Sequence, residues 1–276
     1  MKNINNNFNH FVQLNKKMNI NSQLDFLQKD TPKYVSFYSI ISTVLIWEIC
    51  CRMQFIPPLF LPAPSAIVHA AKDMTTSGEL VQSLTDSLYR IGIGYMIGSI
   101  LGIITGLILS FSKWMNAILS PLIYIVYPIP KIALLPLIIL WLGIGEFPKI
   151  TIIALGVFFP VFINIFSGVK NIDSNLIKAA VLFKASRTRL LLEVMLPGAL
   201  PSIFAGLKIA SGTSLLLLIA AEMIAAKQGI GTLILHYGNL MLTTKLMVGV
   251  IILSILGLSF NRLLTWIETW ALLQKK

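Results

Sequence analysis

The stretch KNIDSNLIKAAVLFKASRTRLLLEVMLPGALP, from Lys170 to Pro201, interrupts a chain that is otherwise mostly apolar. It holds five Lys or Arg residues and ends in a proline-marked return to hydrophobic sequence. Apolar residues recur in it at helical steps, at Leu176, Ala180, Phe183 and Leu190. A helix here would present one apolar stripe and one cationic face. The pattern predicts a docking surface on a membrane protein.

The composition of the whole chain indicates a lipid environment. Hydrophobic residues make up 56% of the 276 residues and charged residues only 12%, and the mean hydropathy is +0.81. A soluble domain could not bury this much apolar surface in one core. The net charge of +11 does not indicate nucleic-acid binding, because Lys and Arg concentrate at the edges of the apolar segments, as the positive-inside rule requires of cytoplasmic loops.

Six segments are apolar over the roughly 20 residues that a spanning helix needs. They run from Val35 to Met53, Leu88 to Ser112, Trp114 to Leu142, Pro148 to Val169, Leu200 to Ala225 and Thr244 to Trp270. The N-terminal tail, the segment from Lys170 to Pro197 and the C-terminal tail each carry more basic than acidic residues. A count of six spans puts all three on one side of the membrane, which the same rule makes the cytoplasm.

The sequence therefore predicts an all-α membrane protein with both termini inside the cell. A polar cytoplasmic tail covers residues 1–34, a six-helix transmembrane domain covers 35–270 and contains a cytoplasmic segment at 171–197, and a short cytoplasmic tail covers 271–276. His69 and His236 have no second ligand at metal-binding spacing, so we predict no metal site.

The second predicted span carries a glycine run. Gly94, Gly98, Gly102 and Gly106 recur every four residues. This spacing removes the side chains from one face of a helix and predicts close packing against another helix.

The third predicted span, from Trp114 to Leu142, is too long for a straight crossing at about 1.5 Å per residue. Prolines lack an amide hydrogen and clash with the preceding turn, so this span is predicted to break at its prolines, which are Pro121, Pro128, Pro130 and Pro136. Lys131 lies within the broken region. Carbonyl groups that a break sets free at membrane depth need protein or a water-filled cavity around them.

Several stretches resemble the membrane subunits of bacterial ABC importers. They are YPIPKIALLPLIILWLGIGEFPKI at Tyr127–Ile150 and LPGALPSIFAGLKIASG at Leu196–Gly212. LPAPS at Leu61–Ser65 and AEMIAAKQGIG at Ala221–Gly231 resemble the nitrate, sulfonate and taurine branch of that family. The resemblance covers most of the chain after Phe60. It implies the type I importer permease fold, with six transmembrane helices and a cytoplasmic coupling helix between the fourth and the fifth.

The resemblance also implies partners in the bacterial inner (plasma) membrane. A second permease copy, as a homodimer, would complete the path, two ATPase subunits would grip the coupling segments, and a substrate-binding protein would dock outside. The sequence has no GxxxxGK[ST] phosphate loop. We therefore expect ATP and Mg²⁺ on the partner ATPase, no cofactor on this chain, and no enzymatic activity of its own.

By the same resemblance, a set of residues around the Lys170–Pro201 stretch would contact the ATPase, namely Lys178, Ala179, Ala180, Phe183, Lys184, Ala185, Arg187, Leu196 and Pro197. Two of them depart from the family pattern. Lys178 stands where the family usually has Glu, and Lys184 where it usually has a turn glycine. A non-glycine residue in a left-handed turn costs about 1 kcal/mol. We expect either a different turn or a small strain, and a facing ATPase surface that offers acidic groups.

Four polar residues within the spans are candidates for the translocation path: Lys131, Asn164, Ser211 and Glu222. Ionisable residues inside spans often line ion paths, so Lys131 could attract an anion, and it could equally snorkel or pair structurally beside the break. Asn164 and Ser211 could bind substrate or another helix. Glu222 could serve a gate, a binding-protein contact or a structural pair.

The sequence thus predicts a permease subunit for a small anionic solute such as a sulfonate, taurine or nitrate. A permease for a thiamine-precursor pyrimidine or a similar nutrient is the alternative within the family. A stand-alone secondary transporter or channel is the alternative from another class, because broken helices and a lysine at membrane depth also suit it. The spans hold neither paired carboxylates nor a nucleophile–base pair, which argues against an intramembrane enzyme.

Overall fold

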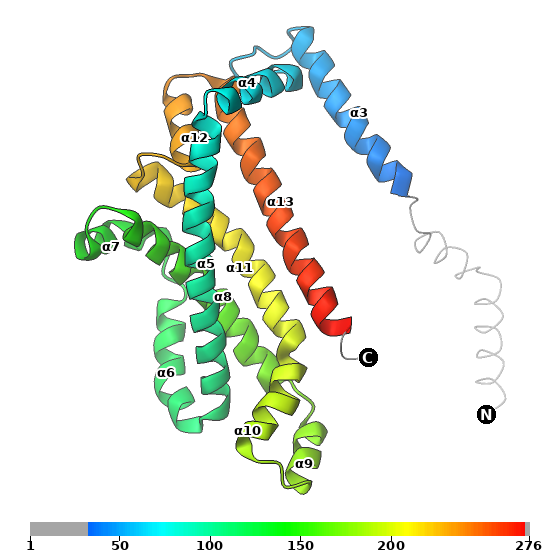
Figure 1. Ribbon diagram of the computed structural model, residues 1–276, viewed down its shortest axis with the longest axis vertical. Helices are drawn as coiled ribbons and strands as arrows, with labels where there is room; N and C mark the ends of the chain where they lie inside the picture. Colours follow the sequence, from blue (N-terminus) through cyan, green and yellow to red (C-terminus); the bar gives the residue numbers. More distant parts are fainter. Residues whose placement is uncertain (1–32, 274–276) are drawn as a thin grey trace, which may run out of the picture.

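The computed structural model describes residues 33–273, in which every regular element is a helix (Figure 1). The long helices are α3 (Lys33–Arg52), α5 (Glu79–Phe111), α8 (Glu146–Lys170), α11 (Leu196–Ala225) and α13 (Thr243–Leu273). The shorter ones are α4 (Pro64–Thr76), α6 (Lys113–Val126), the 3-10 helix η1 (Lys131–Leu134), α7 (Leu135–Leu142), α9 (Ser174–Leu182), α10 (Arg187–Arg189), the π-helix η2 (Leu190–Met195) and α12 (Ile230–Asn239). The predicted all-α class is confirmed.

Four helical segments of the described range are long and apolar enough to cross a membrane: α5, α8, η2 with α11, and α13. The bent pair of α6 and η1–α7 makes a fifth if it is one span. Helix α3, which corresponds to the predicted span from Val35 to Met53, is not among them. The count of six spans therefore stays a prediction, as do the domain boundaries. Residues 1–32 and 274–276 of the two predicted tails lie outside the described residues.

Helix α5 begins at Glu79, well before the predicted start at Leu88. Hydropathy marks where the apolar run begins, and the helix continues the same buried face for two further turns through Leu80, Ser83 and Ser87. The other long spans agree with their predicted bounds to within a few residues, because there the apolar run and the helix coincide.

The glycine run of α5 lies directly against α8. A Cβ atom added at Gly98 would clash with the carbonyl oxygen of Ala154, and one added at Gly102 would lie 2.9 Å from the carbonyl oxygen of Phe158. Additions at Gly94 and Gly106 would lie 2.7 and 3.0 Å from isoleucine side chains of α8. The two backbones are therefore too close for any side chain between them.

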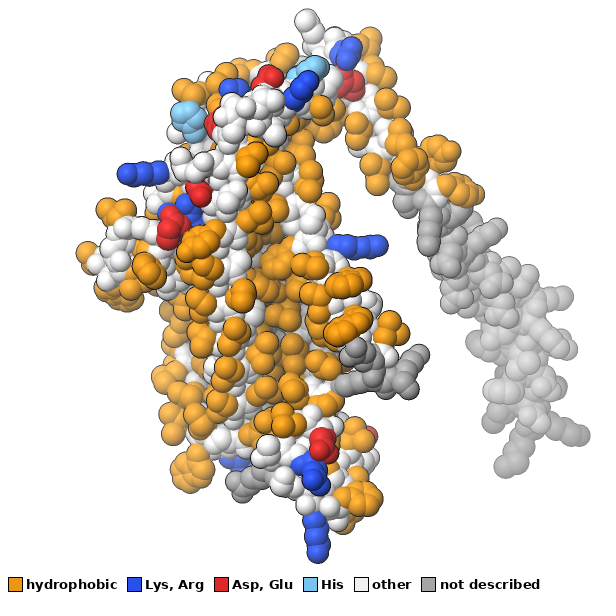
Figure 2. All heavy atoms as spheres, in the orientation of Figure 1, with side chains coloured by type: hydrophobic (Ala, Val, Ile, Leu, Met, Phe, Trp, Pro, Cys, Tyr) orange, Lys and Arg blue, Asp and Glu red, His pale blue; other side chains and the backbone are white. Residues whose placement is uncertain are grey.

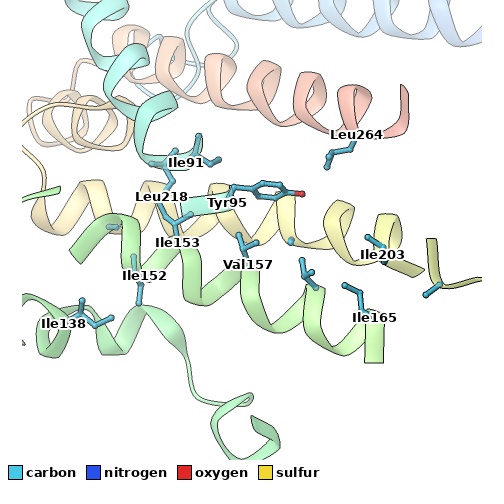
Figure 3. Packing of buried hydrophobic residues seen from close by; sticks show 14 of the residues in the cluster. Ile91, Tyr95, Ile138, Ile152, Ile153, Val157, Ile165, Ile203, Leu218 and Leu264 are labelled. Carbon is cyan, nitrogen blue, oxygen red and sulfur yellow. The ribbon is translucent and has the colours of Figure 1, made fainter. Parts of the chain in front are cut away.

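The hydrophobic core lies between α5, α8 and α11, with α13 against one side (Figure 3). Its labelled residues include Ile91 and Tyr95 from α5, Ile153 and Val157 from α8, and Leu218 from α11. The Tyr95 hydroxyl donates a hydrogen bond to the Leu207 carbonyl at 2.8 Å, and its ring packs edge-on against Phe260 with 4.6 Å between centroids. One side chain thus ties three helices together.

The predicted break in the third span is confirmed. Helix α6 ends at Val126, and the chain turns by 90° before continuing from Lys131 through α7. Pro128 and Pro130 lie in this break. Pro121 lies inside α6 and Pro136 in the first turn of α7. The predicted breaks at these last two prolines do not occur, and for Pro136 the reason is that the first turn of a helix has no intrahelical partner for its amide groups.

Helix α3 diverges from the bundle and is tied to it near its C-terminal end (Figure 1). The Glu48 carboxylate accepts hydrogen bonds from the Ser65 amide at 3.0 Å and the Ser65 hydroxyl at 2.7 Å, and Arg52 pairs with it at 2.5 Å. Ser65 lies in the first turn of α4, whose free amide groups need acceptors. The LPAPS stretch therefore serves to join α3 to α4.

A phenol on α12 bonds the first residue of α5. The Tyr237 hydroxyl donates to the Glu79 carboxylate at 2.7 and 2.8 Å. Burial and the neighbouring carboxylate raise the pKa of Tyr237 to about 12. The phenol is therefore protonated, and able to donate, at physiological pH.

Candidate functional site

A charged network lies at the end of the bundle that carries α12, and we define it by Ser87, Arg90, Glu146, Lys149 and Glu222. Arg90 Nε donates to Glu146 at 2.6 Å and its Nη2 to the same carboxylate at 3.1 Å. Its Nη1 donates to Glu222 at 2.7 Å and to the Gln228 carbonyl at 2.6 Å. Arg90 is 4% exposed and Glu222 is fully buried. One guanidinium thereby joins α5, α8, α11 and the loop that leads to α12.

The Glu222 carboxylate also caps the start of α12. It accepts hydrogen bonds from the Gly231 amide at 2.8 Å and the Ser87 hydroxyl at 2.8 Å, and the Ser87 oxygen in turn accepts from the Ile230 amide at 2.9 Å. A Cβ atom at Gly229 would lie 2.5 Å from that carboxylate. The two ends of the AEMIAAKQGIG stretch are therefore in contact. Glu222 accepts from an amide group at the start of α12, and Gly229 leaves room for its carboxylate.

The charges of this network balance. Lys149, which is 3% exposed, donates to Glu146 at 2.8 Å, so two cations face two carboxylates. A buried charge persists only when it is paired and hydrogen-bonded. This arrangement fixes the helix ends relative to one another, and it leaves Glu222 with no exposed surface. Of these five residues, only Glu222 was predicted from the sequence to have a function. Arg90, Glu146 and Lys149 are charged residues within or at the end of apolar helices. Such a residue needs a partner, and this was the signal that could have identified them.

A cavity of about 390 Å³ lies between α8, α11 and the break after α6. Two predicted path residues, Lys131 and Asn164, line it, and so does Thr213, which the sequence analysis did not single out. The Lys131 ammonium donates to the Val126 carbonyl at 3.4 Å and to the Tyr127 carbonyl. It also lies 4.2 Å from the centroid of the Phe159 ring. Lys131 thus satisfies carbonyls freed by the break while its charge stays at the cavity wall.

The other two predicted path residues lie away from this cavity. Ser211 is 4% exposed and donates to the Lys208 carbonyl of its own helix at 2.7 Å. Glu222 belongs to the charged network described above. The structure therefore brings together Lys131 and Asn164 and leaves Ser211 and Glu222 elsewhere. Among residues 33–273, no group of three or more His, Cys, Asp or Glu side chains is arranged to hold a metal ion.

The opposite end of the bundle carries α9, and the single helix that the apolar spacing indicates from Leu176 to Leu190 is interrupted at Lys184, where the resemblance implied a turn. The chain forms α9, a turn, and then α10 and η2. The Lys184 amide donates to the Val181 carbonyl at 2.9 Å and the Ala185 amide to the Ala180 carbonyl at 3.0 Å. This pair of bonds is the Schellman pattern that ends many helices, with a left-handed residue after the cap. Lys184 is that residue, with φ of 53°.

Six exposed side chains of α9 and its turn lie where the sequence predicts contact with an ATPase, and for that prediction we name them the coupling surface: Leu176, Lys178, Val181, Leu182, Phe183 and Lys184. Ala179, Ala180 and Ala185 are only half-buried. Arg187 begins α10, and Leu196 and Pro197 begin α11. The turn, rather than a continuous stripe, makes Phe183 the most exposed of these apolar residues, at 86%.

Replacing Lys184 by Gly is expected to stabilise the end of α9 by about 1 kcal/mol, because glycine adopts the left-handed conformation without strain. Amide hydrogen exchange at position 184 and Ala185 would slow by about fivefold. The matched control is Lys178→Gly within the same helix, which should speed exchange because glycine weakens a helix interior by about 1 kcal/mol. Faster exchange in both variants would contradict a strained turn.

The chain matches known transport proteins over most of its length. Residues 98–271 match the family described as binding-protein-dependent transport system inner membrane component. The putative aliphatic sulfonates transport permease protein SsuC of Escherichia coli (strain K12) is 39% identical over 217 residues, covering 79% of this chain and 82% of the relative. Its Bacillus subtilis (strain 168) counterpart is 35% identical, covering 80% and 81%. The taurine transport system permease protein TauC of Escherichia coli (strain K12) is 35% identical, covering 81% and 83%.

One solved structure supports the fold. A chain of the MetNI methionine ABC transporter, in an inward-facing conformation, superposes with a TM-score of 0.62 at 21% sequence identity. The alignment covers 71% of this chain and 98% of the solved one.

Proposed function

The chain belongs to the family of binding-protein-dependent transport system inner membrane components, and we propose that it forms one half of the path of an ATP-driven importer for taurine or another small sulfonate. The observation that carries the substrate class is the identity of 35% to 39% with permeases named for sulfonates and taurine. A multi-pass permease subunit of this family conducts solute, and the energy for transport comes from another subunit.

The cavity beside the helix break is the proposed half of the path. Lys131 supplies a positive charge at its wall, and the Asn164 amide, which donates one hydrogen to the Pro160 carbonyl, keeps a second for a sulfonate oxygen. Much of the remaining wall is apolar, as in most small-molecule sites. A second copy of this chain would close the open side, so that two lysines face one anion.

We further propose that the α9 end faces the cytoplasm and the α12 end faces outward. Lys113, Lys170, Lys178 and Lys184 lie at or near the α9 end of the helices that they border, which is the pattern of a cytoplasmic side. Helix α3 would be the sixth span and both termini would be cytoplasmic. In this orientation the coupling surface meets two ATPase subunits, which bind ATP and Mg²⁺, and a substrate-binding protein docks at the α12 end.

Reconstitution in liposomes tests this proposal. The chain, its ATPase subunit and its binding protein loaded with taurine would be assembled together. Transport of labelled taurine across the membrane should then require ATP on the side where the ATPase subunit lies. Accumulation by the chain alone, driven by an ion gradient, would instead indicate a secondary transporter. ATP-dependent uptake of a thiamine-precursor pyrimidine but of no sulfonate would contradict the proposed substrate class and still support an ATP-driven importer.

Replacing Lys131 by Met should leave assembly intact and lower taurine uptake about tenfold, which corresponds to about 1.4 kcal/mol of lost attraction for the anion. The measurement is the initial rate of uptake in the reconstituted system, with the amount of assembled complex determined in parallel. Ser211→Ala is the control, because Ser211 lies off the cavity and bonds within its own helix. Equal rates for Lys131→Met and the unmodified chain would leave Lys131 with its structural role at the break.

A further inference from the structure

The coupling surface exposes large apolar side chains at the extreme end of the bundle. Leu182 is 82% exposed and Phe183 is 86% exposed, and they occupy neighbouring positions at the C-terminal end of α9. Exposed apolar groups next to polar ones mark a contact surface for a partner. In Figure 2, Lys, Arg and acidic side chains gather around apolar ones at this end of the molecule.

The positive charge of this surface is not compensated by its own acidic residues. Asp173 accepts the Asn175 amide at 2.8 Å and caps α9, and Glu193 lies 3.5 Å from Arg189. Neither carboxylate pairs with Lys178 or Lys184, and within residues 33–273 the structure gives these two ammonium groups no hydrogen-bond or ion-pair partner.

The backbone of Lys184 is also strained. Its φ of 53° is the left-handed conformation in which a lysine is strained by about 1 kcal/mol relative to glycine. Backbone strain of this kind persists where the surroundings or a function require the residue. The turn itself requires the left-handed conformation, and within residues 33–273 Lys184 has no side-chain partner that would account for a lysine rather than a glycine there.

We propose that the coupling surface docks into a groove of the ATPase subunit whose floor is apolar and whose rim carries carboxylates. Phe183 and Leu182 enter the groove, and Lys178 and Lys184 each meet an Asp or Glu of the rim. This inference rests on the proposed function and adds the chemistry of the partner surface. Charge complementarity at a rim sets which ATPase is accepted and how fast it binds, so the two lysines act as specificity determinants for the subunit pair.

The test uses the full chain coexpressed with its own ATPase subunit, purified in detergent and treated with a carbodiimide that joins an ammonium group directly to a carboxylate in contact with it. We expect a covalent link from Lys184 or Lys178 to an Asp or Glu of the ATPase, located by peptide mass spectrometry. Lys184→Arg keeps the charge and cannot form the amide, so it should retain the ATPase and lose the Lys184 link.

Binding measurements provide the second arm. Lys184→Gly keeps the turn and removes the charge, and Lys178→Gln removes the other charge. Each should raise the Kd for the ATPase about threefold at low salt and reduce its salt dependence, and Lys178→Glu should raise it about tenfold. Phe183→Ala should weaken binding at all salt concentrations alike.

The outcomes distinguish a failure of the acidic rim from a failure of the proposed function. If the unmodified chain fails to hold the ATPase at any salt concentration, the proposed function itself fails. If it holds the ATPase, but forms no lysine–carboxylate link and the neutral variants bind as tightly as the original, the acidic rim is overturned and the importer is not. The same result would follow if the two lysines served anionic lipid headgroups instead.

Discussion

Replacing Arg90 by Met should abolish accumulation of folded protein or lower its stability by about 3 to 5 kcal/mol, the usual consequence of leaving a buried carboxylate without its cation. Glu222 has no exposed surface, and Arg90 is the cation that pairs with it at 2.7 Å. The substitution would also remove the donor to the Gln228 carbonyl. Thermal unfolding in detergent, together with the yield of monodisperse protein, would measure the loss.

A second substitution distinguishes the buried charge from the lost packing. In Arg90→Met with Glu222→Gln the uncompensated charge disappears, while the glutamine oxygen can still accept from the Gly231 amide and the Ser87 hydroxyl. Much of the stability should return. Arg189→Met is the matched control, since Arg189 and Glu193 are about two-thirds exposed and 3.5 Å apart, and such pairs contribute at most about 1 kcal/mol. Similar losses at both arginines would refute the special role of the buried network.

Replacing Gly98 by Ala should destabilise the bundle by about 1 to 3 kcal/mol, although alanine favours helices. The added methyl group would clash with the Ala154 carbonyl oxygen and lie 2.7 Å from the Val157 Cβ atom. Neither atom can rotate away as a flexible chain end could, so α5 and α8 must separate. The separation would also loosen the side chains packed beside the seam.

Gly92→Ala provides the control in the same helix. A Cβ atom at Gly92 would meet nothing within 4 Å, so this variant should be neutral or more stable by up to about 1 kcal/mol. Thermal unfolding of the two single variants compares them under identical conditions. Equal stability of the two would mean that α5 and α8 do not rely on the seam.

The parts of the fold that depend on local pattern were predictable. The glycine run of α5 and the prolines at Pro128 and Pro130 identify a close helix pair and a break, because four-residue spacing and missing amide groups act within one helix. The coupling stretch was predicted less well. Its apolar spacing continues through Phe183 to Leu190 and by itself indicates one helix, whereas the resemblance implied a turn at Lys184, and the chain does turn there with a left-handed φ. Hydrophobic periodicity alone could not have placed this turn.

The charged network could not be predicted because it depends on tertiary contacts. Arg90 is separated in sequence by 56 residues from Glu146 and by 132 from Glu222. Each appears in its own segment as a single charge near an apolar run, compatible with a path, a gate or a pair. The same limit applies to the cavity: Lys131 and Asn164 were both candidates, and only the packing of α8 and α11 against the break separates them from Ser211.

The order of synthesis decides when the Arg90 network can form. Domains are made from the N-terminus onward, so α5 enters the membrane with its arginine while both carboxylate partners are still to be made. A lone arginine is unfavourable at membrane depth, and it gains full compensation only when Glu222 arrives at the end of α11. The Arg90–Glu222 bond can therefore form only after α5, α8 and α11 have all been made and have packed in register, and a truncated or mispacked chain would lack it.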